Sequence, residues 1–223
     1  MTINFAAFVP AFDQLIEERG GLSYGLGRKN GMMCVEAAVC TALDLPFGDD
    51  PKCVEAQVRD FKIEMNDSLG WLNPKDRAEG LRNLAIAQVG SKGVVDGVEF
   101  VTRLIIKVVN KLLPELFRDI NMEGLLKFSS ECETVNSIDG VQSLLRNIQG
   151  SKVYDNYHFN ECLEFICIGC IVLNGMCIAT GIKYAHRVYS TLKYPSKSKY
   201  LRMGADLAFE VLKELNSPGC DWV

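Results

Sequence analysis

No stretch of this sequence alternates apolar and polar residues for long enough to suggest a β-strand. The chain also lacks internal repeats and low-complexity tracts, which excludes a repeat array and a disordered polypeptide. Apolar residues recur at helical spacing, and 48% of the 223 residues are hydrophobic. We therefore predict an all-α fold, a compact multi-helix bundle with a central buried apolar helix. It should form a single domain over residues 1–223, with residues 91–93 as the best candidate for an internal boundary.

Histidine is nearly absent, with two residues, and this limits the metal sites that the chain can form. Cys167 and Cys170 make a lone C-x-x-C pair, with Cys177 one heptad further on. A structural zinc site usually needs two such pairs. The nine cysteines lie in apolar segments, where a free thiol packs as a small hydrophobe. We expect no metal and no cofactor.

The N-terminus lacks the basic, apolar and cleavage regions of a signal peptide, and the cysteine number is odd. Both features predict a cytoplasmic protein. Residues 165–182 carry no charge, and Lys183 and Arg187 follow them as basic residues follow a membrane span. Glycines and cysteines make that run only modestly apolar. We interpret it as a central buried helix and do not expect a membrane span.

Acidic residues are missing between Glu164 and Asp206, although the net charge of the chain is -4. The overall charge argues against general nucleic-acid binding, whereas the local charge is basic. Lys183 and Arg187 lie four residues apart on one helix face and could neutralise an anionic ligand. An ordinary solvated helix end is the alternative. The cations of this stretch are Lys183, Arg187, Lys193, Lys197, Lys199 and Arg202.

Helix boundaries are indicated by capping residues and by proline. A first helix begins near Phe5 and ends at Gly20, where glycine can adopt a left-handed conformation. The pairs Asp50-Pro51 and Asn73-Pro74 predict helix starts. Further signals are a long apolar helix over 94–113, a capping box from Ser130 to Glu133, a cap at Asn160 and a final helix over 199–215.

Glu36 is the single charge in the apolar run over residues 32–43, which reads as a buried helix. An ionised carboxylate there must be paired, hydrogen-bonded or protonated. One interpretation is that Glu36 faces a ligand, as a hydrogen-bond acceptor or as a general base. The other is a buried structural pair with Arg59, Arg77 or Arg82. The two are compatible if an arginine completes a ligand site.

The segment 20–31 contains five glycines together with Arg28 and Lys29, and it runs into the start of the buried helix. Backbone amides at a helix start attract anions, so a phosphate group is the natural ligand. The spacing matches neither a P-loop nor a dinucleotide-binding fingerprint. A flexible surface loop is the alternative. Cys34 could act as a nucleophile at this helix start, but no histidine lies near it in the sequence.

Asn66 and Asp67 end one predicted helix and Asp50 begins another, so these side chains could line the same pocket as Glu36. Capping also explains Asp50, because proline follows it. Asn66 falls seven residues after Arg59 on one helix face. Glu36 and Asp67 could divide the roles of acid and base in a hydrolysis reaction.

Four segments of the first half of the chain resemble a family of uncharacterised bacterial and bacteriophage proteins. They are Gly31-Met32-Met33-Cys34-Val35-Glu36-Ala37, Asp49-Asp50-Pro51-Lys52-Cys53-Val54, Phe61-Lys62-Ile63-Glu64-Met65-Asn66-Asp67 and Arg77-Ala78-Glu79-Gly80-Leu81-Arg82. The similarity covers about residues 20–92. It implies that Glu36, Asp50, Pro51, Cys53, Asn66 and Asp67 form one unit, and it implies no particular chemistry.

These observations favour a protein that binds, and by binding could sequester, a small anionic, nucleotide-like ligand. The phage association makes capture of a host signalling nucleotide one form of this hypothesis. A hydrolase or transferase acting through Glu36 and Asp67 is one alternative. A protein-interaction module, with the apolar back half forming a homodimer, is another. The predicted ligand-binding residues are Glu36, Arg28, Lys29, Asn66, Asp67, Arg59, Lys183 and Arg187.

Overall fold

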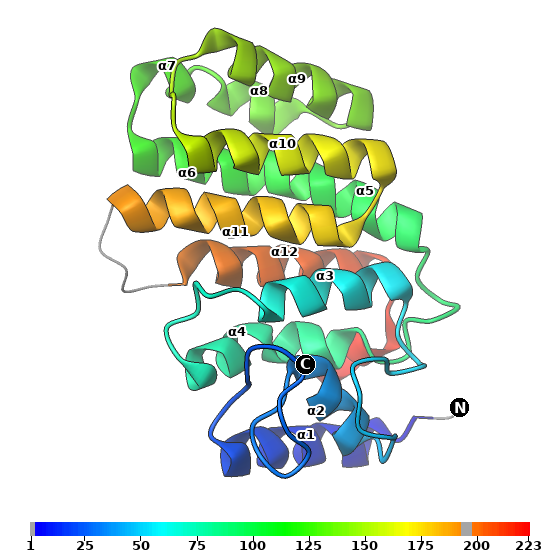
Figure 1. Cartoon of the computed structure of the whole chain (residues 1–223). Coiled ribbons are helices and arrows are strands. Elements are labelled where there is room, and N and C mark those ends of the chain that lie inside the picture. Colours follow the sequence, from blue (N-terminus) through cyan, green and yellow to red (C-terminus); the bar gives the residue numbers. More distant parts are fainter. Residues whose placement is uncertain (1–2, 193–197) are drawn as a thin grey trace.

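The computed structural model describes residues 3–192 and 198–223, and within them the chain is helical with no β-strand, as predicted (Figure 1). The secondary-structure elements are α1 (Phe5–Arg19), α2 (Val35–Ala42), α3 (Ala56–Asn66), α4 (Pro74–Ala87), α5 (Gly97–Lys107), the π-helical turn η1 (Val108–Leu112), α6 (Leu113–Ile120), α7 (Glu123–Leu126), α8 (Ser129–Thr134), α9 (Ile138–Ser151), α10 (Tyr157–Val172), α11 (Gly175–Leu192), α12 (Lys199–Glu214) and the 3-10 turn η2 (Pro218–Trp222).

The helices lie across the molecule in a stack, which Figure 1 shows from the side. α8 and α9 form one end of the stack, followed by α10, α11, the layer of α12 and α3, then α4, and finally α2 and α1. α11 packs against α3, and α12 packs against α4. Helices from both sides of residues 91–93 therefore share one core, and these three residues are part of the connection between α4 and α5.

The first helix begins and ends where the sequence predicts, and the fourth begins where it predicts. Gly20 follows α1 with a φ of 75°, the left-handed conformation that glycine adopts readily. The side chain of Asn73 accepts a hydrogen bond of 2.9 Å from the amide of Asp76, and Pro74 occupies the first helical position. α12, at Lys199–Glu214, also matches its predicted range.

Three predicted helix-start signals are wrong. Asp50 does not begin a helix: α3 starts at Ala56 with Glu55 as its cap, and the carboxylate of Asp50 binds Arg59 and Lys52 instead. Asn156, not Asn160, caps α10 by accepting a hydrogen bond from the amide of Phe159. The capping box proposed for Ser130 is also absent, because α8 begins one residue earlier without a side-chain cap.

The long apolar helix predicted over 94–113 begins at Gly97 and does not stop near Pro114. Its hydrogen-bond pattern changes over the π-helical turn η1, and α6 then continues to Ile120. A proline lacks an amide donor, and it is tolerated here because it lies in the first turn of α6, next to the change of pattern.

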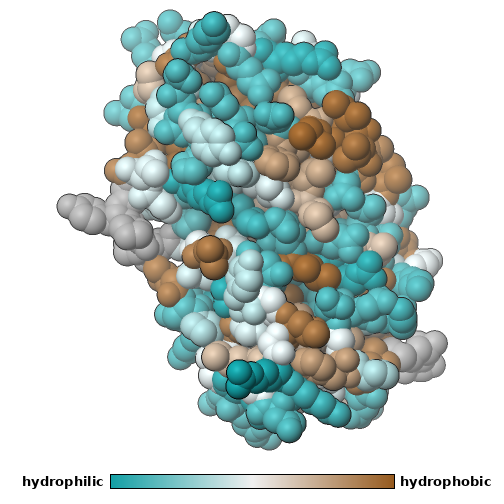
Figure 2. Space-filling model, viewed as in Figure 1, coloured by the Kyte–Doolittle hydropathy of each residue, from teal (hydrophilic) through white to brown (hydrophobic). Residues whose placement is uncertain are grey.

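The charge-free run 165–182 is divided between two helices. α10 ends at Val172, Leu173 has a φ of 45°, and α11 begins at Gly175. α11 contacts α10, α3 and α12, so it is the central helix of the stack. Ile171 and Val172 are 68% and 54% exposed, and Figure 2 shows a brown apolar area over this end of α10. Among the described residues no helix has the length and apolarity needed to cross a bilayer.

The last turn of the chain packs against the first layers of the stack. η2 contacts α4 and α1. The ring of Trp222 stacks on the ring of Phe5 with 5.7 Å between centroids and 11° between planes. Gly219 lies directly on α4, since a Cβ atom added to it would come within 2.0 Å of the carbonyl oxygen of Ile86.

Replacing Gly219 with alanine should lower the free energy of unfolding by about 1–3 kcal/mol, because the methyl group forces η2 away from α4. Gly150 is the matched control. It lies inside α9 with open space around its added Cβ atom, so Gly150→Ala should stabilise the protein by about 0.5–1 kcal/mol. Urea denaturation of both variants measures the two effects. Equal stability of the variants would contradict the observed packing of η2.

Candidate functional site

The glycine-rich segment between α1 and α2 forms a well-defined loop. An isolated bridge joins Gly27 and Met33, and the amide of Arg28 donates to the carbonyl of Met32 at 2.9 Å. The φ of Gly27 is 75°, and a Cβ atom added to it would lie 2.4 Å from that same carbonyl oxygen. Glycine is required at this position both for the backbone angle and for the close approach. The segment is therefore not a loosely held surface loop.

Asn66 and Asp67 hold this loop from the end of α3. The amide nitrogen of the Asn66 side chain donates to the carbonyl of Ser23 at 3.0 Å, and Asp67 accepts a hydrogen bond of 2.9 Å from the amide of Gly25. Asn66 is buried. Both residues lie beside the loop, and their hydrogen-bonding groups are occupied by the loop itself. Their observed role is to fix its shape.

The start of α2 also uses its amides internally. The amide of Val35 donates to the side-chain oxygen of Asn66 at 3.2 Å, and the amide of Ala37 donates to the sulfur of Cys34 at 3.3 Å. A phosphate group would have to displace these partners. Burial raises the pKa of Cys34 to about 11, so the thiol stays protonated and is a poor nucleophile.

Glu36 is enclosed in the core, which contradicts the expectation that it faces a ligand. Its exposed fraction is 0%, and so is that of Lys62 in α3, whose Nζ lies 3.2 Å from the Glu36 carboxylate. Gln88 donates a second contact to the carboxylate at 2.9 Å. Burial raises the pKa of Glu36 and lowers that of Lys62. The interpretation as a structural pair is therefore supported, with a lysine as the partner.

None of the three arginines predicted as partners forms an ion pair or hydrogen bond with Glu36. Arg77 donates to the carbonyl of Leu22 at 2.9 Å and so holds the beginning of the loop. Arg82 binds Asp13 of α1 through two hydrogen bonds of 2.7 and 2.6 Å. Each guanidinium group is committed to another part of the chain.

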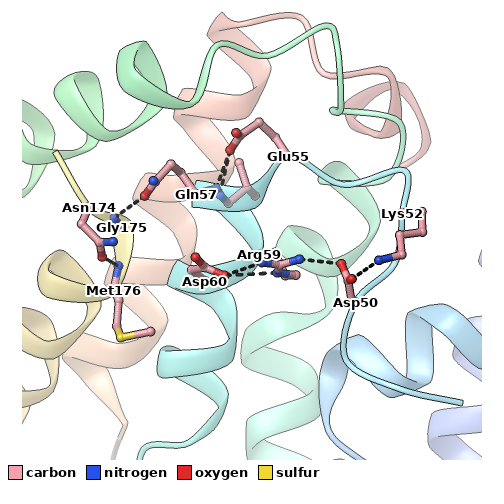
Figure 3. A network of polar contacts seen from close by, with 10 residues as sticks. Asp50, Lys52, Glu55, Gln57, Arg59, Asp60, Asn174, Gly175 and Met176 are labelled. Atoms are coloured by element: carbon pink, nitrogen blue, oxygen red, sulfur yellow. Dashed lines mark hydrogen bonds and ion pairs between the residues drawn. The ribbon is translucent and has the colours of Figure 1, made fainter.

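Arg59 lies on the outer part of α3 between two carboxylates. Figure 3 shows it reaching Asp50 on one side and Asp60 on the other, while Lys52 also binds Asp50. In the same view Gln57, near the start of α3, receives a hydrogen bond of 2.9 Å from the amide of Gly175. Arg59 is thus neutralised by its neighbours and joins the connection before α3 to the helix itself.

A small cavity lies where a ligand pocket is expected. Its volume is about 30 Å³, and Cys34, Asp49, Asn66 and Asp67 are among the residues that line it. Glu36 is not. A single water molecule needs roughly 10–15 Å³ of such space, so the cavity has room for a water molecule and not for a nucleotide.

Lys183 and Arg187 of α11 are both engaged away from the loop. Lys183 forms an ion pair with Glu64 of α3, which also accepts a hydrogen bond from Thr180. The guanidinium carbon of Arg187 lies 4.9 Å from the centroid of the Tyr184 ring. The predicted convergence of these cations with Arg28 is not observed in any of these contacts. Lys193 and Lys197 of the same basic stretch lie outside the described residues.

Three cations lie on this loop or next to it. Arg19, at the end of α1, donates a hydrogen bond of 2.7 Å to the carbonyl of Asn30, the residue that follows Arg28 and Lys29 in the chain. None of the three has an acidic partner within the described part of the chain. Tyr24 is 57% exposed on the same loop. We call Arg19, Tyr24, Arg28 and Lys29 the loop-tip cluster.

Sequence reasoning missed Arg19 because its contact spans eleven residues and involves a backbone carbonyl. The available signal was its place as the last residue of α1, directly before the glycines. Side chains at the end of a helix commonly bind the backbone that follows it.

The cysteines are all unpaired. Within residues 3–192 and 198–223, histidine, cysteine and acidic side chains do not gather in groups of three or more that could hold a metal ion. Cys170 and Cys162 are buried in α10, whereas Cys167 and Cys177 are half-buried. Burial raises the pKa of each of these thiols.

Comparisons with protein-family models, with curated proteins and with solved structures give no significant match to this chain. The resemblance of residues 20–92 to the uncharacterised family remains a prediction. Three of its four segments lie in or next to α2, α3 and α4, which contact one another.

Removing one member of the Glu36–Lys62 pair leaves the other buried without its charge partner. Lys62→Met or Glu36→Gln alone should lower the free energy of unfolding by about 3–5 kcal/mol. The double variant should lose less than the sum of the single losses, because no buried charge remains. Urea denaturation of all four proteins measures this coupling. Additive losses of unfolding free energy would contradict the predicted coupling between Glu36 and Lys62. Asp13→Asn, which breaks a half-exposed pair with Arg82, is the control and should cost under about 1 kcal/mol.

Proposed function

We propose that this protein binds an anionic, nucleotide-like ligand at the loop-tip cluster. The observation that carries the proposal is that Arg28 and Lys29, and Arg19 bonded to the same loop, have no acidic partner among the described residues. In this arrangement the three cations would contact phosphate oxygens. The exposed ring of Tyr24 would stack on a base or another planar group.

The cations of the loop tip differ from Arg59 and Lys183 because they have no acidic partner among the described residues. Arg59 is bound by two aspartates, and Lys183 is bound by Glu64. A cation that is already paired gains little from an external anion, since its existing partner must be displaced. Arg28 and Lys29 need no such exchange. The loop tip is therefore the better candidate for anion binding.

The shape of the loop also supports binding. Gly27 and the buried side chain of Asn66 fix the backbone before any ligand arrives. A loop that is already ordered loses less conformational entropy when it binds a partner. The tip is an open surface and not a closed pocket, so charge should supply much of the affinity. Binding should then weaken as salt screens that charge.

The proposal assigns no ligand contact to Glu36 and no reaction to the site. Glu36 is sealed in the core, and Asp67 is bound to the amide of Gly25. Neither carboxylate is placed to share a substrate with the other. We accordingly propose binding without turnover, with sequestration as its effect. Capture of a host signalling nucleotide is one form of this proposal.

The double substitution Arg28→Gln and Lys29→Gln should weaken binding of the tightest member of a nucleotide panel by about tenfold or more, since it removes two charge-assisted contacts. Isothermal titration calorimetry at two salt concentrations measures the affinity. Lys127→Gln is the control, because Lys127 is exposed in the distant α7–α8 layer. An absence of heat for the whole panel, or equal affinities in both variants, would disprove this function.

Homodimer formation is a second candidate, favoured by the apolar surface at the turn between α10 and α11. Ile171, Val172 and Met176 are exposed there by 68%, 54% and 44%. Residues 165–182 include no charge. An uncharged apolar surface can face a second copy of itself across a two-fold axis without repulsion between like charges.

Ile171→Asp should therefore shift the protein from dimer to monomer in light scattering, because two carboxylates would then face each other. Leu69→Asp is the matched control. Leu69 is 80% exposed beyond the C-terminal end of α3, whereas Gly175 contacts α3 at its N-terminal part. A wild-type protein that is monomeric at all concentrations would exclude the dimer.

A further inference from the structure

A groove of about 330 Å³ lies between α1 and α4, apart from the loop-tip cluster. Its volume falls within the range of roughly 300–1,000 Å³ that is typical of small-molecule sites. Phe12 and Ala78 are buried and, with Ile16, form an apolar floor. The end of α1 and the start of α4 meet here, since the amide of Leu22 donates to the carbonyl of Pro74 at 3.0 Å.

Two of the charged pairs at the rim are already made. Asp13 of α1 and Arg82 of α4 form two hydrogen bonds across the groove. Glu79 lies 3.2 Å from Arg202 of α12. These groups are neutralised by one another and help to hold the groove open at a fixed width. They are not available to a ligand without loss of an existing contact.

Two opposite charges at the rim remain uncommitted. Glu17 belongs to the last turn of α1, and Lys75 belongs to the first turn of α4. Both are exposed and neither has a partner among residues 3–192 and 198–223. They lie on opposite walls of the groove because their helices form those walls. The C-terminal end of α1 has a partial negative charge, as Glu17 does. The N-terminal end of α4 has a partial positive charge, as Lys75 does.

We propose that this groove binds a small zwitterion with an apolar body, of which an α-amino acid with a large apolar side chain is the simplest example. The ammonium group would lie at Glu17, beside the negative end of α1. The carboxylate would lie at Lys75, beside the positive end of α4. The apolar body would cover Phe12, Ile16 and Ala78. This site shares no side chain with the loop-tip cluster, so either one can fail without the other.

The test compares ligands that share the phenylalanine side chain and differ in the charges of the backbone groups. L-phenylalanine carries both charges, phenylalaninamide keeps only the ammonium group, and N-acetylphenylalanine keeps only the carboxylate. Binding is followed by amide chemical shifts in NMR titrations. We expect L-phenylalanine or L-leucine to bind about tenfold more tightly than either single-charge relative, with shifts at residues of α1 and α4.

Two exposed substitutions assign the charges. Lys75→Gln should weaken the binding of L-phenylalanine and N-acetylphenylalanine by about tenfold and leave that of phenylalaninamide unchanged. Glu17→Gln should weaken the binding of L-phenylalanine and phenylalaninamide by about tenfold and leave that of N-acetylphenylalanine unchanged. Lys29→Gln, in the loop-tip cluster, should change none of these affinities. The proposal is overturned if no ligand moves the resonances at millimolar concentration, or if affinity is unaffected by both groove substitutions.

Discussion

A carboxylate and an ammonium group sealed from solvent hold the first layers of this stack in register. Glu36 comes from α2, Lys62 from α3 and Gln88 follows α4, so the two contacts of Glu36 tie together α2, α3 and the end of α4. Desolvation makes such a pair expensive, and its net contribution to stability is small or negative. The pair instead determines how the helices are arranged, because other packings of α2 and α3 would leave Glu36 or Lys62 buried without its charge partner. The position of the loop depends on that arrangement, because its two ends are carried by α1 and α2.

The same arrangement explains why the loop is rigid while its cations remain available. Polar groups on the inner side are consumed by the loop backbone, as for Asn66 and Asp67. On the outer side, Arg28 and Lys29 have no acidic partner among the described residues. Sequence reasoning grouped all four as ligand contacts. The structure separates them into anchors and exposed cations.

Much of the fold could be predicted from local patterns. The helical class follows from the spacing of apolar residues, and the caps at Gly20 and Asn73 follow from short-range geometry. These features depend on neighbours within one turn of helix. The prediction failed at Asp50, whose carboxylate finds a stronger partner in Arg59 than in free helix amides. Competition of this kind is set by the tertiary fold.

The partner of Glu36 was the harder case. Lys62 follows it by 26 residues, and periodicity does not reveal which residue of α3 meets α2. The sequence favours arginine as the partner, because arginine is the usual choice for a buried carboxylate. Lysine serves here because its compact charge lies at the end of a flexible apolar stem, which can pass through an apolar layer to the carboxylate. Only the packing of the two helices distinguishes these choices.

The stacking of Trp222 on Phe5 places a limit on the order in which this protein can be assembled during synthesis. The ribosome makes α1 before η2, so Phe5 lacks this ring partner until Trp222 has emerged. Until then the ring of Phe5 and the part of α4 at Ile86, against which Gly219 packs, stay open to solvent and to other chains. The nascent chain is therefore more prone to association at α1 and α4 before η2 is made than after it.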